Sequence, residues 1–232
     1  MGVVWHRLTT SISYKFLCIF GNVRTTKKLS VQLDDKFIER LLVWACQFDE
    51  VVWMDSNDCK REYSSYKAIL AVDAFTSIKT DHYDAFDRLN EYQSLTKDWL
   101  FGYLSYDLKN DLEPLSSENI DELDFPALYF FQPKRLFLFS EDSVEIRYVP
   151  MVADEVDLDW NAIQNMEIKA ETSDQPPIRI SLRTSKDRYF EKVSEMLSHI
   201  HRGDIYEANF CQEFYAREVK LDPVKTYQSL NT

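Results

Sequence analysis

Apolar and polar positions along the chain form short strand-like runs between longer helical stripes. The clearest stripe comprises Phe37, Leu41, Trp44, Ala45 and Phe48, and it follows Asp34 and Asp35, either of which can cap a helix. Shorter helices are predicted at residues 83–92 and 157–164. Apolar runs predict strands at residues 51–54, 68–75, 99–105, 127–131, 136–140 and 144–149. Because strands, helices and hairpins are intermixed, the pattern favours an α+β fold over regular βαβ winding.

A polar segment that ends in two prolines, residues 170–177, interrupts this pattern. Its composition is typical of a linker. We therefore expect a first domain over residues 1–170 and the beginning of a second region over residues 178–232.

The second region is expected to start with a strand at residues 178–182 and to continue with an amphipathic helix. Thr184 or Ser185 opens this helix, and Gly203 supplies a left-handed stop. Its apolar stripe consists of Tyr189, Val193, Met196, Leu197 and Ile200. Asp222 and Pro223 begin a last amphipathic helix, and the chain ends there. Because nothing further in the chain can cover that helix, we expect an interrupted protein.

Between these helices, residues 205–216 alternate as a strand would. One face is apolar apart from Gln212, and the other carries Glu207, Asn209, Cys211 and Glu213. Glu207 and Asn209 are about 7 Å apart if the strand is regular. The polar face has two interpretations: a side exposed to solvent, or a buried site, where a carboxylate needs partners because its burial is unfavourable. Near a substrate, Glu207 acts as a base or holds an ammonium-like group.

The charge balance excludes one class of partner. Acidic residues outnumber basic residues by 39 to 27, which gives a formal net charge of −12. Such a surface repels phosphate backbones, so the chain is not expected to bind nucleic acid.

Cysteine usage and apolar runs indicate a cytoplasmic protein. The cysteines, Cys18, Cys46, Cys59 and Cys211, are scattered without a C-x-x-C pair and read as reduced thiols. The apolar stretch at residues 16–20 is far shorter than the roughly 20 residues that span a membrane. Residues 5–20 resemble a signal peptide only faintly, since Lys15 interrupts them and no small-residue cleavage site follows.

Several enzyme classes are excluded by missing motifs. Four glycines cannot form a phosphate-binding loop or a dinucleotide fingerprint. The chain also lacks a G-x-S-x-G elbow, an H-E-x-x-H motif and zinc-ligand spacing. His199 and His201 fall on the last turn of their predicted helix, where they complement the negative end of its dipole.

Three segments, taken in order, carry a resemblance. Residues 52–57 read V-W-M-D-S-N and residues 99–108 read W-L-F-G-Y-L-S-Y-D-L. The long helix ends in Gly203-Asp204-Ile205-Tyr206, and residues 209–214 read N-F-C-Q-E-F. Together they resemble the chorismate-binding family of aminodeoxychorismate synthase component I and anthranilate synthase component I. The Asp-Ser-Asn and Phe-Cys-Gln-Glu-Phe variants look more like the aminodeoxychorismate branch.

The resemblance implies a two-sheet antiparallel sandwich with flanking helices and an active site between the sheets. It implies a Mg²⁺-dependent enzyme that adds ammonia to chorismate and expels its 4-hydroxyl, en route to p-aminobenzoate and folate. A glutamine amidotransferase subunit would supply the ammonia. The family's magnesium ligands lie C-terminal to residue 232, so we expect no metal ligand here and no activity from this chain alone.

Two sets of site residues follow from the resemblance. Relatives that activate water carry Lys at the position of Glu207 and ammonia users carry Gln, so Glu207 argues against an isochorismate synthase and is expected to attract ammonia. Asn209 matches a pocket-lining Asn, and we predict both as catalytic. Asp55, Ser56 and Asn57 coincide with the region where relatives hold tryptophan. An ordinary strand-end turn remains an equal interpretation of this triplet.

Two other functions stay open. The first is anthranilate synthase component I, which leads to tryptophan. The second is a non-catalytic binding or regulatory half that grips an amidotransferase or an amino acid.

Overall fold

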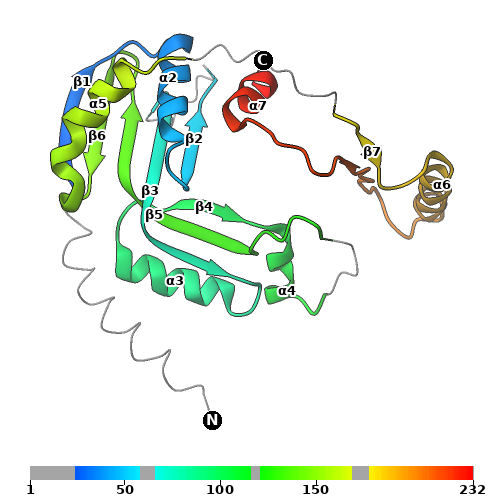
Figure 1. The fold of residues 1–232 in the computed structure, drawn as a ribbon. Coiled ribbons are helices and arrows are strands. Elements are labelled where there is room, and N and C mark those ends of the chain that lie inside the picture. The colour runs from blue at the N-terminus through cyan, green and yellow to red at the C-terminus, as the bar shows by residue number, and fades with distance from the viewer. Residues whose placement is uncertain (1–23, 58–65, 116–120, 169–177, 232) are drawn as a thin grey trace. The chain divides into compact units, whose positions relative to one another are not determined.

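The computed structural model describes residues 24–57, 66–115, 121–168 and 178–231. The chain divides into two compact units, residues 1–168 and 169–232. The first unit contains a six-stranded antiparallel sheet and the second a two-stranded sheet, each with helices (Figure 1). This confirms the predicted α+β class, whereas the packing of two sheets as a sandwich stays a prediction. The predicted linker at 170–177 and the N-terminal leader lie outside the described residues.

The large sheet has the strand order β1-β6-β5-β3-β2, and β4 pairs with the first part of β5. Its strands are β1 (Thr25–Ser30), β2 (Val51–Asp55), β3 (Ala68–Thr80), β4 (Phe101–Leu104), β5 (Leu128–Phe139) and β6 (Ser143–Tyr148). Figure 1 shows the long central strands β3 and β5 bending midway, so that the sheet has two halves. Strands β1, β2 and β6 belong to one half and β4 to the other.

The prediction of two separate strands at residues 127–131 and 136–140 is wrong, because one continuous strand, β5, runs across Pro133. A proline lacks the N–H that a central strand donates, and therefore reads as a break. Here β3 has a β-bulge opposite Pro133, between Ala74 and Thr76. The interrupted ladder does not require that N–H, so the strand continues.

Helices α2 (Asp35–Ala45) and α5 (Val156–Gln164) lie side by side over one half of the sheet, and the 3-10 helix η2 (Pro150–Glu155) leads into α5 (Figure 1). The predicted stripe of α2 is confirmed, since Phe37, Leu41, Trp44 and Ala45 are buried. Trp44 packs edge-on against Phe137 of β5, with ring centroids 5.6 Å apart. The cap is also confirmed, because the Asp34 carboxylate accepts the N–H of Phe37 at 2.7 Å.

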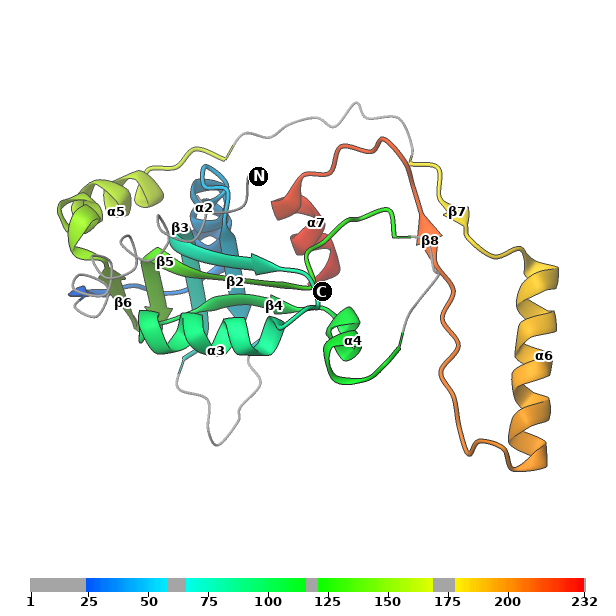
Figure 2. The same cartoon turned by 90° about the horizontal axis from the view of Figure 1, so that it is seen from below.

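The other half of the sheet carries α3 (Ala85–Thr96), η1 (Tyr106–Leu108) and α4 (Lys109–Leu112), and Figure 2 shows α3 running alongside the strands. The N-terminus of α3 is capped from α4, because the Asp111 carboxylate accepts the N–H groups of Asp84 and Ala85 at 3.0 and 3.1 Å. Strand β4 approaches β5 closely at Gly102. Ala85 of α3, Leu108 of η1 and Leu128 of β5 form one buried cluster, which packs these elements together at this end of the sheet.

The second unit consists of β7 (Ser181–Leu182), α6 (Lys186–Arg202), β8 (Phe214–Tyr215) and α7 (Pro223–Leu230). Both predicted helices are confirmed with their caps: Ser185 accepts the N–H of Arg188, Asp222 accepts that of Lys225, and Gly203 ends α6 with a φ of +82°. The apolar stripe of α6 is half-buried or exposed within this unit.

Candidate functional site

The segment after α6 carries both residues that we predict as catalytic. Residues 204–213 form neither helix nor strand, so the prediction of a strand over 205–216 is wrong except at β8. Strand N–H and C=O groups need a neighbouring strand, and β7 pairs with only Phe214 and Tyr215. The side chains of Glu207 and Asn209 are both exposed. Their catalytic role stays a prediction.

Other polar side chains of this segment are paired within the unit. Glu213 binds the Arg183 guanidinium through two hydrogen bonds of 3.0 and 2.9 Å. Asp204 accepts from Arg202 at 2.7 Å and lies 2.8 Å from the Nδ1 atom of His199. Glu213 and Asp204 are thus each held in an ion pair with an arginine, Arg183 and Arg202 respectively.

The triplet Asp55-Ser56-Asn57 ends β2 in a tight turn. The Asp55 carboxylate accepts the N–H of Asn57 at 2.9 Å, and Ser56 donates its N–H to the carbonyl of Lys67 at 3.0 Å. Asn57 has a φ of +48°, in the left-handed region that Asn tolerates well. These contacts form the strand-end turn that the sequence allows, and the tryptophan pocket stays a prediction.

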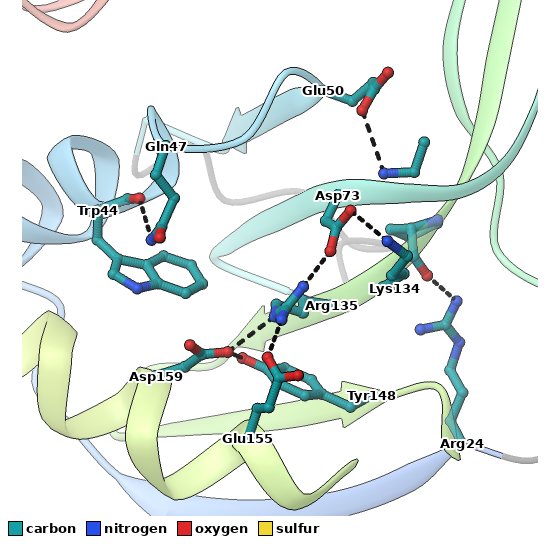
Figure 3. A network of polar contacts seen from close by, with 12 residues as sticks. Arg24, Trp44, Gln47, Glu50, Asp73, Lys134, Arg135, Tyr148, Glu155 and Asp159 are labelled. Atoms are coloured by element: carbon teal, nitrogen blue, oxygen red, sulfur yellow. Dashed lines mark hydrogen bonds and ion pairs between the residues drawn. The ribbon is translucent and has the colours of Figure 1, made fainter. Parts of the chain in front are cut away.

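A charged network in the first unit was not predicted (Figure 3). Its centre is Arg135 of β5, which is only 5% exposed. The guanidinium donates to the carboxylates of Asp73, Glu155 and Asp159, the last at 2.9 Å. Lys134 also donates to Asp73, at 2.8 Å. The network therefore joins β3 and β5 to η2 and α5.

The surroundings of Arg135 favour its charged form. Burial alone would lower the pKa of Arg135, but the hydrogen bond and the charge of Asp159 outweigh it and raise that pKa. Burial and the Asp159 charge raise the pKa of the Tyr148 phenol, which donates to Asp159 at 2.9 Å. The Phe48 ring packs on the guanidinium with 4.9 Å between Cζ and the ring centroid. Since all three guanidinium nitrogens donate to protein carboxylates, the network is suited to holding elements together.

A second buried ion pair lies near the bend of the sheet. Arg24 binds Asp98 through hydrogen bonds of 3.0 and 2.8 Å, and both side chains are at most 7% exposed. Gln132 donates to Asp98 at 2.7 Å and accepts from Thr76 at 3.2 Å. The hydroxyls of Thr76 and Tyr92 are 2.7 Å apart. A polar chain thus runs from the start of β1 to α3.

The sequence contained a signal for these networks that the strand pattern obscured. Asp73 stands within the apolar run A-I-L-A-V-D-A-F, and Arg135 immediately precedes L-F-L-F. A charged residue inside a buried strand needs a partner of opposite charge. Which residues pair could not be read from the sequence, because Asp73 and Arg135 lie far apart in the chain.

Tyr129 of β5 makes a further polar contact, with the carboxylate of Glu50 at 3.2 Å. Burial and the Glu50 charge raise the pKa of Tyr129 from 10.0 to about 12. The folded protein therefore keeps this phenol protonated at a pH where the unfolded chain ionises it. The resulting stabilisation is present below about pH 10 and is lost between about pH 10 and pH 12.

We expect Tyr129→Phe to make the free energy of unfolding less dependent on pH between 10 and 12, because the phenol with the raised pKa is gone. Urea unfolding at several alkaline pH values, followed by tryptophan fluorescence, measures this. Tyr106→Phe is the matched control, since Tyr106 belongs to the same unit and is 84% exposed. Equal pH slopes for wild type and Tyr129→Phe would contradict the expectation.

The described residues offer neither a metal site nor a membrane span. Among them, no group of three or more His, Cys, Asp and Glu side chains is arranged to hold a metal ion. The Mg²⁺ that the resemblance implies, with ligands expected C-terminal to residue 232, stays a prediction. No helix in the described part is long and apolar enough to cross a membrane.

Comparison with known proteins identifies relatives of this chain. Residues 49–232 match the family described as chorismate binding enzyme. An anthranilate synthase component I-like protein of Synechocystis sp. is 29% identical over 146 residues, which are 58% of this chain and 28% of that protein. The chain thus spans less than two thirds of the length of this relative.

Proposed function

Since the chain belongs to the family of chorismate binding enzymes, we propose that it forms the N-terminal part of an aminodeoxychorismate synthase component I. The observation that carries the proposal is the family match over residues 49–232, which contains all three motif segments in order. The Asp-Ser-Asn and Phe-Cys-Gln-Glu-Phe variants support the aminodeoxychorismate branch.

The proposed reaction replaces one substituent of chorismate. Ammonia attacks the ring, a C–N bond forms, the bond to the 4-hydroxyl breaks, and water leaves with 4-amino-4-deoxychorismate as the product. A glutamine amidotransferase subunit supplies the ammonia in the cytoplasm.

Within this scheme, Glu207 and Asn209 bind the nitrogen nucleophile. The exposed carboxylate of Glu207 attracts ammonium and accepts a hydrogen bond from ammonia, whereas the amide of Asn209 donates or accepts one. An ionised Glu207 offers only hydrogen-bond acceptors, and ammonia is a hydrogen-bond donor. Relatives that use water as the nucleophile carry a Lys amine at this position, which Glu207 does not supply.

A second candidate is anthranilate synthase component I, and it is supported by the similarity to the anthranilate synthase component I-like protein of Synechocystis sp.. The two candidates share chorismate and ammonia and differ in the product. The third alternative, a non-catalytic half that binds an amidotransferase or an amino acid, requires no product at all.

The test is a product analysis on the protein encoded by the longest reading frame that contains residues 1–232. Chorismate, ammonium and Mg²⁺ are added, and the products are identified by mass spectrometry and fluorescence. We expect 4-amino-4-deoxychorismate. Fluorescent anthranilate would support the second candidate, and unchanged chorismate would support the non-catalytic one.

We expect Glu207→Gln to change ammonia-dependent turnover in that protein, by raising the KM for ammonia through loss of the charge that attracts ammonium. Because glutamine keeps an acceptor oxygen and loses only the charge, the expected increase is about fivefold, the difference between a hydrogen bond to a charged acceptor and one to a neutral acceptor. Steady-state kinetics with varied ammonium measure the effect. Glu195→Gln removes an equally exposed carboxylate from α6 and serves as the control. Unchanged kinetics in Glu207→Gln would refute a special role for its charge.

We also propose that the turn at residues 55–57 binds tryptophan, and isothermal calorimetry with the full chain tests this. Binding heat is expected for wild type, and a weaker affinity for Asp55→Ala, which removes the acceptor that orders the turn. An absence of heat in wild type would favour the purely structural turn.

A further inference from the structure

In the two central strands, β3 and β5, the alternation of side chains between the faces of the sheet is interrupted where Ala74 pairs with Pro133. In β5, Phe131 and Leu136 belong to one buried cluster although they are five positions apart. In β3, Ala71 belongs to this cluster and Ala74, three positions further on, packs against it. In a regular strand such pairs point to opposite faces of the sheet. Asp73 lies between Ala71 and Ala74 and has a left-handed φ of +64°, and the β-bulge of β3 follows Ala74. These two irregularities change the facing of the strand and bend the sheet. The two halves of the sheet therefore meet at the bulge.

At this level Glu50 supplies hydrogen bonds to β3 from the loop before β2. Asp73 donates its N–H to the backbone carbonyl of Glu50 at 3.1 Å, and Ala74 donates its N–H to the Glu50 carboxylate at 3.3 Å. Asp73 has a φ of +64°, a left-handed conformation that a residue with a Cβ adopts at an energetic cost. The other oxygen of that carboxylate accepts from Tyr129 on β5. Glu50 thus holds β3 in its bent conformation and links it to β5.

Arg24 performs the corresponding task on β5. Its Nη2 atom donates to the carbonyl of Pro133 at 2.7 Å, and its Nη1 atom donates to the carbonyl of Arg147 on β6 at 3.1 Å. The same guanidinium binds Asp98. One buried side chain therefore connects β5, β6 and the segment before β4. Figure 3 shows Glu50 reaching toward β3 and Arg24 reaching toward the strand that bears Lys134 and Arg135.

These contacts are separate from the hydrophobic core under α2. That core is formed by residues such as Leu41, Leu70 and Phe137, whose apolar side chains are fully buried. Its stability depends on apolar burial, whereas the bend depends on charge-assisted hydrogen bonds to backbone groups. The two can be perturbed independently.

We propose that Glu50 and Arg24 form a clamp that fixes the bend of the large sheet, and that loss of either side chain lets the two halves of the sheet move relative to one another while the core under α2 stays folded. The clamp is a conformational device of the first unit and does not depend on the proposed reaction.

Amide hydrogen exchange of the full chain, measured by NMR, tests the Glu50 half of the clamp. In Glu50→Ala, the Ala74 amide is expected to exchange about tenfold faster or more, the effect of losing a hydrogen bond to a charged group. The amide of Leu41 in α2 is expected to keep its wild-type rate. Glu50→Gln, which retains an acceptor oxygen, is expected to restore most of the protection, and Asp49→Ala is the neighbouring control. Equal acceleration at Ala74 and Leu41, or none at Ala74, would overturn the proposal.

Double electron–electron resonance, which measures the distance between two spin labels, tests the Arg24 half of the clamp. One spin label is placed on Cys46 after α2 and another on Gln93→Cys in α3, with the remaining cysteines replaced by serine. Arg24→Met is expected to broaden the distance distribution between the labels, whereas Lys28→Met, which alters an exposed side chain of β1, leaves it unchanged. An unchanged distribution in a folded Arg24→Met variant would overturn the proposal. If Arg24→Met does not fold, Arg24→Lys is measured in its place, and the exchange rate of the Ala74 amide replaces the distance measurement. Faster exchange than in wild type supports the proposal, and an unchanged rate overturns it.

Discussion

Gly102→Ala is expected to lower the free energy of unfolding of the first unit by about 4 kcal/mol or more, one of the largest effects that a single substitution produces. A Cβ at this position would lie 1.9 Å from the Tyr129 carbonyl oxygen and 2.6 Å from the Phe130 Cα. Both are backbone atoms of β5, so no side-chain rotation can relieve the overlap. Strand β4 must move away from β5, and the buried ring of Phe101 moves with it.

Tryptophan fluorescence during urea unfolding measures this effect, because every tryptophan of the chain precedes residue 161 and the signal reports on the first unit. Gly203→Ala is the matched control. No atom lies within 4 Å of a Cβ there, and only the left-handed φ opposes the substitution. It is expected to shorten α6 without shifting the fluorescence midpoint. A wild-type midpoint for Gly102→Ala would show that β4 does not pack as described.

Arg135→Met is expected to lower the free energy of unfolding of the first unit by about 3–5 kcal/mol, the usual consequence of removing one partner from a buried ion pair. Methionine preserves much of the side-chain volume, so the loss is mainly electrostatic. Without the guanidinium, the carboxylates of Asp73, Glu155 and Asp159 face one another with Lys134 as their only cation among the contacts of Figure 3. At least one of these carboxylates is then left uncompensated.

The pH dependence separates this electrostatic loss from a packing defect. The difference in unfolding free energy between wild type and Arg135→Met should shrink as pH falls from 6 to 4, because protonation removes the repulsion among the carboxylates. Lys134→Met is the control and is expected to lower the free energy of unfolding by less than about 1 kcal/mol, because Lys134 is partly exposed and its ion pair is with Asp73. A difference that does not depend on pH would indicate a packing defect in place of charge repulsion.

Helices were predicted well because their signals are local. Each signal lies at or within the helix that it defines. Examples are the stripe and Asp34 cap of α2, the Ser185 cap and Gly203 stop of α6, and the Asp222 cap of α7. Apolar spacing and side-chain capping act over one or two turns, so a short window contains the whole cause.

Strands were predicted less completely, because a strand depends on its neighbours. Residues 205–213 alternate like a strand, but within the part of the chain that the structure describes they pair with no strand and are irregular. In contrast, β5 crosses Pro133 because β3 supplies a bulge at the opposite position. In both cases the outcome depends on residues distant in the chain.

Family membership, the fold class and the locally capped termini of α2, α6 and α7 could be read directly from the order of residues, since these motifs and caps are contiguous. The N-terminus of α3, in contrast, is capped by the distant Asp111. The tertiary structure alone shows that Arg135 pairs with Asp73 and that Arg24 donates a hydrogen bond to the Pro133 carbonyl. It also decides that the side chain of Glu207 is exposed. The physical reason is range: hydrogen bonds and ion pairs act over a few ångströms, and which groups come that close is set by strand register and packing.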